Sequence, residues 1–115
     1  HALLVENSNA AMRCLQGNVE NLGVQNEAGL VKDDVLKVLK RPPQEPYNLV
    51  FMDPPYRKKL AEPALRLLAA NGWLAPGAFV TAEIEKEARF AVPQGFTLET
   101  DRLLGQTRVC IWMAS

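Results

Sequence analysis

The sequence predicts an α/β fold with a mostly parallel sheet that ends in an antiparallel hairpin. Short apolar runs of strand length alternate with stretches whose apolar residues recur at helical spacing. The last two β-rich runs, 96–104 and 107–113, are separated only by Gly105 and Gln106, which is typical of a hairpin. A chain of 115 residues is expected to form a single domain, 1–115.

The first third of the chain predicts strand, helix, strand and short helix. Residues 2–6 form a short apolar strand that ends in an acid. Asn7 or Ser8 caps the helix that follows, and Gly23 ends it. Residues 27–32 predict a shorter strand near the sheet edge. The stripe of the first helix is expected to consist of Ala11, Leu15, Val19 and Leu22.

The central stretch, 47–56, combines a strand with an unusual end. Residues 47–52 are apolar and include Val50 and Phe51, which predicts a fully buried parallel strand. Two prolines follow Asp53 and cannot donate to a β-ladder, so the strand must end there. Asp53 is therefore expected at the carboxyl end of a strand, the edge where open α/β sheets bind ligands.

The second half predicts a helix, a strand and the hairpin. The helix ends at Asn71-Gly72, and its buried stripe is expected to be Leu60, Ala64, Leu67 and Leu68. Residues 79–85 alternate as a strand, and 86–93 connect it to the hairpin. One side of that strand carries Phe79, Thr81, Glu83 and Glu85, and the other carries Val80, Ala82 and Ile84.

Composition limits the classes of function. Thirteen basic and thirteen acidic side chains give no net charge, which disfavours coating of nucleic acid by bulk electrostatics but permits a local basic rim. No apolar run is long enough to cross a membrane and no signal peptide precedes the first strand, so we expect a cytoplasmic protein. Cys14 and Cys110 lack metal-ligand spacing and are expected to be buried thiols in a reducing compartment, with no metal site.

The residues after the central strand suit one kind of chemistry. An exocyclic amino group on a base is a poor nucleophile, because its lone pair is delocalised into the ring. The Asp53 carboxylate and the Pro54 carbonyl can accept its two N–H bonds and turn the lone pair out of the ring plane, while Tyr56 stacks on the base. The structural alternative is a plain strand-to-helix turn, since Asp and Pro are common turn residues.

The pattern Asp53-Pro54-Pro55-Tyr56 resembles the motif of S-adenosylmethionine (SAM)-dependent enzymes that methylate exocyclic nitrogens. Together with 3–6, 51–57, 71–74 and the hairpin, the chain resembles the bacterial small-subunit ribosomal RNA guanine-N2 methyltransferase family (RsmD-type). The resemblance implies a Rossmann-like SAM-dependent methyltransferase fold. It also implies SAM as cofactor, ribosomal RNA as partner, and in-line methyl transfer to the guanine amino nitrogen.

The resemblance assigns roles to individual positions. It places Glu6, with the adjacent Asn7, at the SAM ribose, and Asp34 with Val35 at the adenine; Asp53, Pro54, Pro55 and Tyr56 form the catalytic motif that holds the base. The structural alternatives are a surface carboxylate at a helix N-terminus for Glu6 and a helix cap for Asp34. Arg57, Lys58 and Lys59 either contact RNA phosphates or form a solvated helix start.

The chain departs from the family pattern at its beginning. The family opens with a strand and a glycine-rich loop that supports SAM, and no such loop is found here, so we expect a truncated methyltransferase fold. The missing strand would lie between the 2–6 and 47–52 strands, and a gap there favours a homodimer or element exchange, with weak SAM binding. Two alternatives stay open: an adenine-N6 DNA methyltransferase, and a non-catalytic module that binds nucleotide or a partner.

Overall fold

The computed structural model describes residues 1–53, 60–88 and 91–115. Within these ranges the chain forms two compact units, residues 1–38 (unit 1) and 39–115 (unit 2). The observed order of elements follows the predicted alternation and ends in the predicted hairpin. No helix in the described ranges is long and apolar enough to cross a membrane.

Unit 1 is built on a pair of parallel strands. β1 (Ala2–Glu6) pairs with β2 (Ala28–Lys32), and Glu6 lies opposite Lys32 at the carboxyl ends of the two strands. Helix α1 (Asn9–Leu22) connects them. Ser8 is its N-cap, because its Oγ accepts a hydrogen bond from the N–H of Ala11 at 3.3 Å. The C-cap Gly23 has φ of 68°, the left-handed conformation that glycine adopts without strain.

Two expectations for unit 1 were wrong. Cys14 is exposed on α1, so only Cys110 is a buried thiol. Leu22 is 74% exposed because it occupies the last position of α1, while Met12 joins Val19 as a buried residue. The stripe was therefore misplaced at its C-terminal end, where a helix has no following turn to pack beside it.

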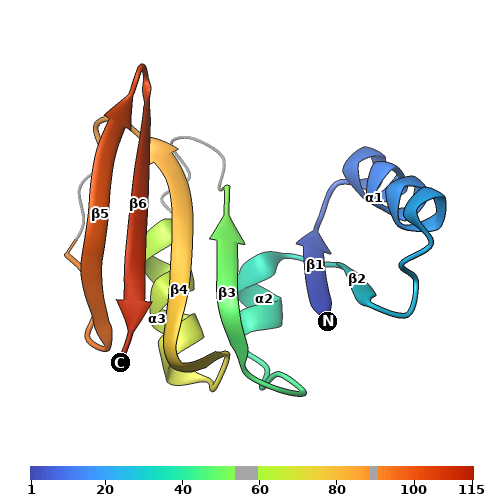
Figure 1. Cartoon of the computed structure of the whole chain (residues 1–115), viewed down its shortest axis with the longest axis horizontal. Coiled ribbons are helices and arrows are strands. Elements are labelled where there is room, and N and C mark those ends of the chain that lie inside the picture. The colour runs from blue at the N-terminus through green and yellow to red at the C-terminus, as the bar shows by residue number, and fades with distance from the viewer. Residues whose placement is uncertain (54–59, 89–90) are drawn as a thin grey trace. The chain divides into compact units, whose positions relative to one another are not determined.

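Unit 2 contains a four-stranded sheet in the order β3-β4-β6-β5 (Figure 1). β3 (Tyr47–Met52) pairs in parallel with β4 (Leu74–Glu85), which confirms the predicted parallel strand. β6 (Thr107–Ala114) runs antiparallel to both β4 and β5 (Phe96–Leu104). Gly105 has φ of 65°, which lets the chain reverse between β5 and β6 in two residues.

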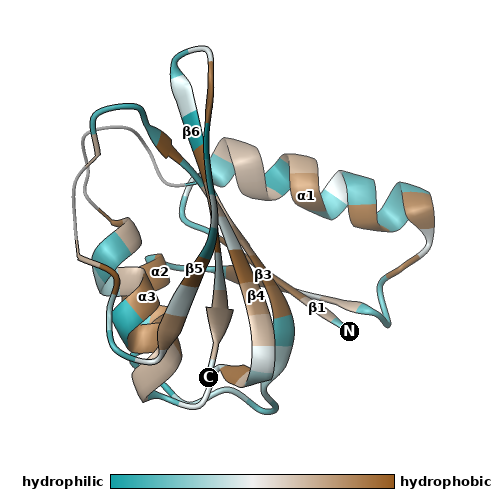
Figure 2. Cartoon of the chain, turned by 60° about the vertical axis from the view of Figure 1, so that its left-hand side comes forward, coloured by the Kyte–Doolittle hydropathy of each residue, from teal (hydrophilic) through white to brown (hydrophobic). Residues whose placement is uncertain are grey.

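Helix α3 (Ala61–Ala70) covers one face of this sheet, which we call the covered face (Figure 2). Its buried residues are Ala61, Ala64, Leu65 and Leu68, close to the predicted stripe. The covered face of the sheet is fully packed: its buried members include Val80, Ala82, Ile84, Cys110 and Trp112. The opposite side of the same strands, which we call the open face, carries Leu49, Phe51, Phe79, Thr81, Glu83 and Val109.

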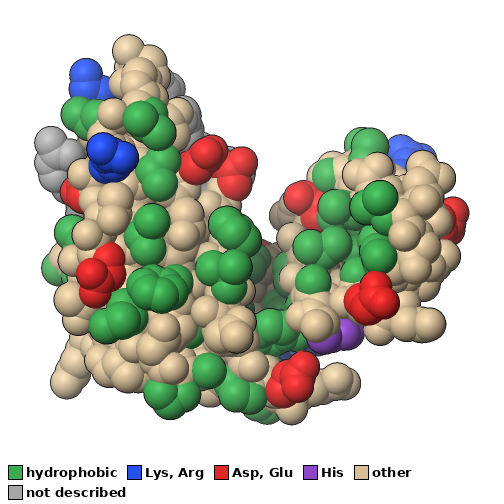
Figure 3. Space-filling model, viewed as in Figure 1, with side chains coloured by type: hydrophobic (Ala, Val, Ile, Leu, Met, Phe, Trp, Pro, Cys, Tyr) green, Lys and Arg blue, Asp and Glu red, His purple; other side chains and the backbone are tan. Residues whose placement is uncertain are grey.

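The open face corrects the prediction that 47–52 is fully buried. Leu49 is 51% exposed and Phe51 is 75% exposed, and their pairing with Phe79 and Thr81 puts both on the open face. Figure 3 shows hydrophobic side chains at the surface of unit 2. An apolar run is the signature of a strand packed on two sides, but in unit 2 α3 packs on one side only. The predicted alternation of 79–85 is confirmed, since Val80, Ala82 and Ile84 are buried whereas Phe79 is 44% exposed.

β4 begins five residues earlier than predicted. Leu74 pairs with Tyr47, the register then shifts, and regular pairing resumes where Leu49 meets Phe79. Gly77 lies inside this irregularity with φ of 78°. Pro76 and Gly77 are residue types that usually interrupt a strand, but here they lie in a bulge that a strand can contain.

Trp73 fastens the start of β4 to the segment before β3. Its indole N–H donates to the carbonyl oxygens of Leu39 at 3.1 Å and Arg41 at 3.0 Å. The side-chain amide of Asn71 also donates to the Leu39 carbonyl, at 2.7 Å. The Trp73 ring stacks on Tyr47 with ring centroids 6.1 Å apart. These contacts fix the amino end of β3, so its carboxyl end is held in register with β4.

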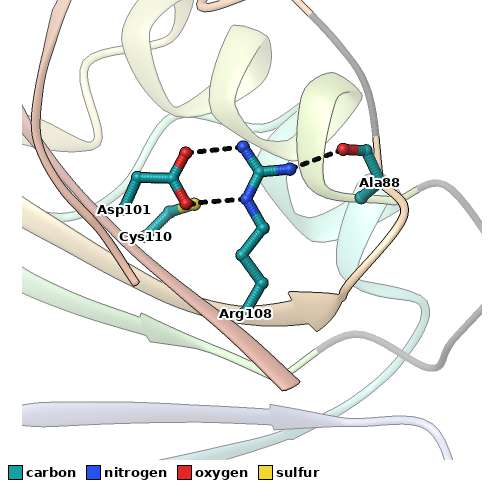
Figure 4. Close-up of polar contacts among 4 residues, drawn as sticks. All are labelled: Ala88, Asp101, Arg108 and Cys110. Carbon is teal, nitrogen blue, oxygen red and sulfur yellow. Dashed lines mark hydrogen bonds and ion pairs between the residues drawn. The ribbon is translucent and has the colours of Figure 1, made fainter. Parts of the chain in front are cut away.

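An ion pair on the covered face ties the hairpin to the preceding connector (Figure 4). The Arg108 guanidinium donates two hydrogen bonds to the Asp101 carboxylate, at 2.7 and 2.6 Å, and one to the carbonyl of Ala88 at 2.6 Å. These hydrogen bonds to Asp101 raise the pKa of Arg108 above its ordinary value. Burial, and then the Asp101 charge, raise the pKa of the neighbouring Cys110 thiol.

Candidate functional site

Asp53 stands where the sequence placed it. β3 ends at Met52, and Asp53 follows with an exposed side chain, so it is the first residue beyond the carboxyl end of this parallel strand. No hydrogen bond or ion pair of its carboxylate falls among the described residues. At the end of a parallel strand, a carboxylate without a partner among the described residues can accept a hydrogen bond from an external donor.

A hollow with a volume of about 370 Å³ opens beside Asp53. Its lining belongs to the carboxyl ends of β3 and β4 and to β6: Phe51, Met52, Asp53, Thr81, Glu83 and Val109. Most of the described lining is apolar, and the two charged groups among these described residues are both carboxylates. Figure 3 shows acidic side chains gathered at this end of β3 and β4. Apolar walls with a few convergent polar groups are typical of small-molecule and base pockets.

Glu83 was not among the predicted site residues. The alternation of 79–85 did put it on the same side as Phe79, but the sequence does not show which residue of another strand lies next to it. In the parallel register, Phe51 pairs with Thr81 and Met52 pairs with Ala82. The next residue along β3 is Asp53, and the next along β4 is Glu83. The position of Glu83 beside Asp53 therefore depends on a long-range strand pairing.

Glu6 lies in unit 1, at the carboxyl end of β1. One oxygen of its carboxylate, Oε1, accepts hydrogen bonds from the backbone N–H groups of Asn7 and Ser8, both at 3.1 Å. This is the structural role that the alternative interpretation gave to Glu6 at the start of a helix. No hydrogen bond of the other oxygen, Oε2, falls among the described residues, and its assignment to a ribose hydroxyl stays a prediction.

Asp34 reaches the same edge of the β1–β2 pair. The N–H of Asp33 donates to the Glu6 carbonyl at 3.2 Å, so the chain beyond β2 runs past the end of β1. The Oδ1 of Asp34 accepts from the N–H of Leu36 at 2.8 Å, which makes Asp34 the cap of α2 (Val35–Leu39). Val35 follows, half-buried. The structure thus brings Glu6, Asn7, Asp34 and Val35 together at one edge of unit 1.

The remaining predicted residues fall in a stretch that the structure leaves undescribed. These are Pro54, Pro55, Tyr56, Arg57, Lys58 and Lys59, all outside the described residues. Their assigned roles stay predictions. Among the described residues there is no group of three or more His, Cys, Asp or Glu side chains that could hold a metal ion.

Comparisons with known proteins point in one direction. A family described as Conserved hypothetical protein 95 matches residues 1–113. Ribosomal RNA small subunit methyltransferase D of Haemophilus influenzae is 36% identical over 93 residues, which are 79% of this chain and 48% of the relative. The protein of the same name in Escherichia coli K12 is 35% identical over 106 residues, 91% of this chain and 52% of the relative.

Solved structures give the same result for the fold. The crystal structure of a proposed methylase from Haemophilus influenzae is similar with a TM-score of 0.89 and 30% sequence identity. The match covers 97% of this chain and 71% of that one. The chain therefore has the Rossmann-like methyltransferase fold, and it spans about half the length of the curated relatives it matches.

Proposed function

The chain belongs to the RsmD-type family, described as Conserved hypothetical protein 95, and from this premise we propose that it is the catalytic domain of a SAM-dependent methyltransferase. Its substrate is the exocyclic N2 of a guanine in small-subunit ribosomal RNA. We assign cofactor-binding residues to unit 1 and base-binding residues to unit 2. The observation that carries the proposal is Asp53, exposed and without a partner among the described residues, at the carboxyl end of β3 beside a hollow of about 370 Å³.

The edge of unit 1 fits the adenosine part of SAM. Glu6 and Asp34 each use one carboxylate oxygen to cap backbone N–H groups and keep the other for a ligand. The parallel pairing of β1 and β2 sets these two acceptors at one edge, as two neighbouring groups of one nucleoside require. Val35 offers an apolar contact to the adenine ring. These residues already have fixed backbones, so binding orders few groups that were free before.

The chemistry at Asp53 follows from what a carboxylate can accept. Bound SAM supplies an electrophilic methyl group. Asp53 accepts one N–H of the guanine amino group, and the Pro54 carbonyl accepts the other, which turns the nitrogen lone pair out of the ring plane. Tyr56 stacks on the base, and Pro55 stiffens the turn. The amino proton leaves late, so Asp53 acts by positioning and needs no unusual basicity.

The proposal is tested by Asp53→Ala in the protein as its gene encodes it. Methyl transfer to small ribosomal subunits, followed with labelled SAM, is expected to fall on the order of 10²-fold or more, because a positioned acceptor is lost. SAM binding by calorimetry should stay close to wild type. Glu99→Ala is the control, since Glu99 is an exposed acid of unit 2 outside the hollow. Near wild-type transfer by Asp53→Ala, or faster transfer to adenine in DNA, contradicts the proposal.

We assign the basic run Arg57, Lys58 and Lys59 to RNA phosphates. Neutralising all three is expected to reduce the log–log salt dependence of RNA binding by up to about 2, at roughly 0.7 per lost contact on a single strand. An unchanged slope would mean that these three cations do not contact RNA phosphates and belong to a solvated loop.

In the same RNA-binding assay, Tyr56→Phe should bind like wild type while Tyr56→Ala binds more weakly, because stacking needs the ring and is worth roughly 1–3 kcal/mol per base.

We also propose that the 115-residue chain on its own self-associates and binds SAM weakly. β3 is an edge strand of its sheet and presents Leu49 and Phe51 on the open face, and a second copy of the chain is the occupant we assign to this edge. Light scattering across a concentration series should give a dimer or larger species, and Leu49→Lys should shift it toward monomer. A monomer that binds SAM tightly contradicts this proposal.

Because ribosomes assemble in the cytoplasm, we propose that the enzyme acts there.

A further inference from the structure

The hollow of unit 2 holds a second carboxylate that the proposed chemistry does not use. Glu83 lines the hollow together with Asp53. It lies on the neighbouring strand β4, directly after Ala82, as Asp53 lies directly after Met52, the partner of Ala82. Its side chain is exposed, and none of the described residues that line the hollow is a cation. No hydrogen bond or ion pair holds the Glu83 carboxylate within the described part of the chain. The Glu83 carboxylate can therefore accept a hydrogen bond from a base that occupies the hollow.

Two carboxylates side by side match only one of the four common bases. A carboxylate accepts hydrogen bonds and donates none. Adenine and cytosine each present an amino donor beside a ring nitrogen acceptor on the Watson–Crick edge, and uracil presents one donor between two acceptors. Guanine alone presents adjacent donors, the N1–H and the N2 amino group. A flipped or single-stranded base is read on this same edge.

We propose that Glu83 is the residue that selects guanine, by accepting the N1–H while Asp53 accepts from the N2 amino group. This inference rests on the proposed function and extends it to base choice. The ring nitrogen N1 of adenine carries a lone pair in place of the proton, so Glu83 would face it without a hydrogen bond and with electrostatic repulsion. A site built to bond a donor rejects an analogue that lacks it, because its own polar group is left unpaired.

The test separates the two acceptors with base analogues. We would measure binding of fluorescein-labelled uridine nonamers with one central guanosine, 2-aminopurine or inosine to the protein as its gene encodes it. 2-Aminopurine keeps the amino group but lacks N1–H, whereas inosine keeps N1–H but lacks the amino group. Wild type is expected to bind the 2-aminopurine RNA about 10- to 100-fold more weakly than the guanosine RNA.

The variants should lose these preferences one at a time. Glu83→Ala should abolish the penalty for 2-aminopurine and keep the penalty for inosine. Asp53→Ala should keep the penalty for 2-aminopurine and reduce the penalty for inosine, since the Pro54 carbonyl still accepts one N–H of the amino group. Glu83→Gln, which keeps one carbonyl acceptor, should restore part of the preference. Glu85→Ala is the matched control, because Glu85 lies two residues along β4 on the same side but outside the hollow. Thermal unfolding of each variant checks that it is folded.

The outcomes distinguish the proposed role of Glu83 from the proposed methyltransferase function on which it rests. If wild type does not prefer guanosine to 2-aminopurine, or if Glu83→Ala keeps that preference, Glu83 does not read N1–H and the inference is wrong. If wild type transfers methyl groups to guanine nonetheless, the proposed function stands. If no methyl transfer to RNA is found in any assay, the proposed function fails first.

Discussion

The two faces of the four-stranded sheet differ in packing although the same strands supply both. On the covered face Val80 and Ala82 are completely buried beneath α3, while on the open face Phe51 is 75% exposed and Phe79 is 44% exposed. Both faces are rich in apolar residues, so composition alone does not separate them. The difference indicates that the covered face stabilises unit 2, whereas the open face, which carries the hollow, stays accessible to solvent.

The largest expected effect comes from replacing leucine with alanine at two positions, one in the helix that packs on the covered face and one on the open face. Leu65→Ala empties a position of α3 with 0% exposure and is expected to lower the free energy of unfolding by about 2–5 kcal/mol. Leu49→Ala removes a side chain that is 51% exposed and should cost less than about 1 kcal/mol. Urea unfolding of the chain measures both. Equal costs would mean that the open face is packed in solution.

A smaller effect is expected from removing one arginine on each face. Arg108→Ala breaks the hydrogen bonds to Asp101 and Ala88 on the covered face and should cost about 1–2 kcal/mol, since both charged side chains keep partial contact with water. Arg102 lies on the open side of β5, opposite Val109, and is exposed. Arg102→Ala should change the free energy of unfolding by no more than about 0.5 kcal/mol. A reversal of this order would contradict the assignment of the ion pair to the stabilising face.

The smallest effect concerns the Cys110 thiol, whose pKa is raised by burial on the covered face and by the nearby Asp101 charge. A raised pKa in the folded state stabilises the fold below the ordinary thiol pKa of roughly 8.5, and that contribution is lost as pH rises above it. The free energy of unfolding should therefore fall above this pH, with a steeper slope in wild type than in Cys110→Ala. Cys14→Ser should keep the wild-type slope, because Cys14 is exposed.

Thiol labelling at neutral pH gives a direct reading of the same difference. Cys14 should react quickly with an aromatic disulfide reagent, and Cys110 only as the protein unfolds. Rapid labelling of two thiols per chain in the native protein would mean that the covered face opens readily.

Local signals in the sequence were reliable, and long-range ones were not. Gly23 as helix end, Asp53 as strand end and the two-residue turn at Gly105 all depend on neighbouring residues, and the structure confirms each. The exposure of Phe51 depends on whether a second layer covers β3, which an apolar run does not reveal. The place of Glu83 depends on the pairing of β3 with a strand thirty residues away.

The caps of unit 1 show why a site residue can look structural. Asp34 and Glu6 satisfy backbone N–H groups through one oxygen each, which confirms the helix-cap interpretation of both side chains. A cap of this kind does not exclude a ligand role, so the ligand interpretation stays a prediction. Asp53 has no such second role among the described residues, and its substitution should separate function from stability more cleanly.

The position of the tryptophans gives the molecule an optical asymmetry. Trp73 and Trp112 are 6% and 1% exposed and both lie in unit 2, whereas residues 1–38 contain no tryptophan or tyrosine. Intrinsic fluorescence therefore reports on unit 2 alone, while the far-ultraviolet ellipticity also includes the fourteen residues of α1. Recorded in one urea titration, the two signals coincide if the units unfold as one cooperative block and separate if unit 1 melts by itself.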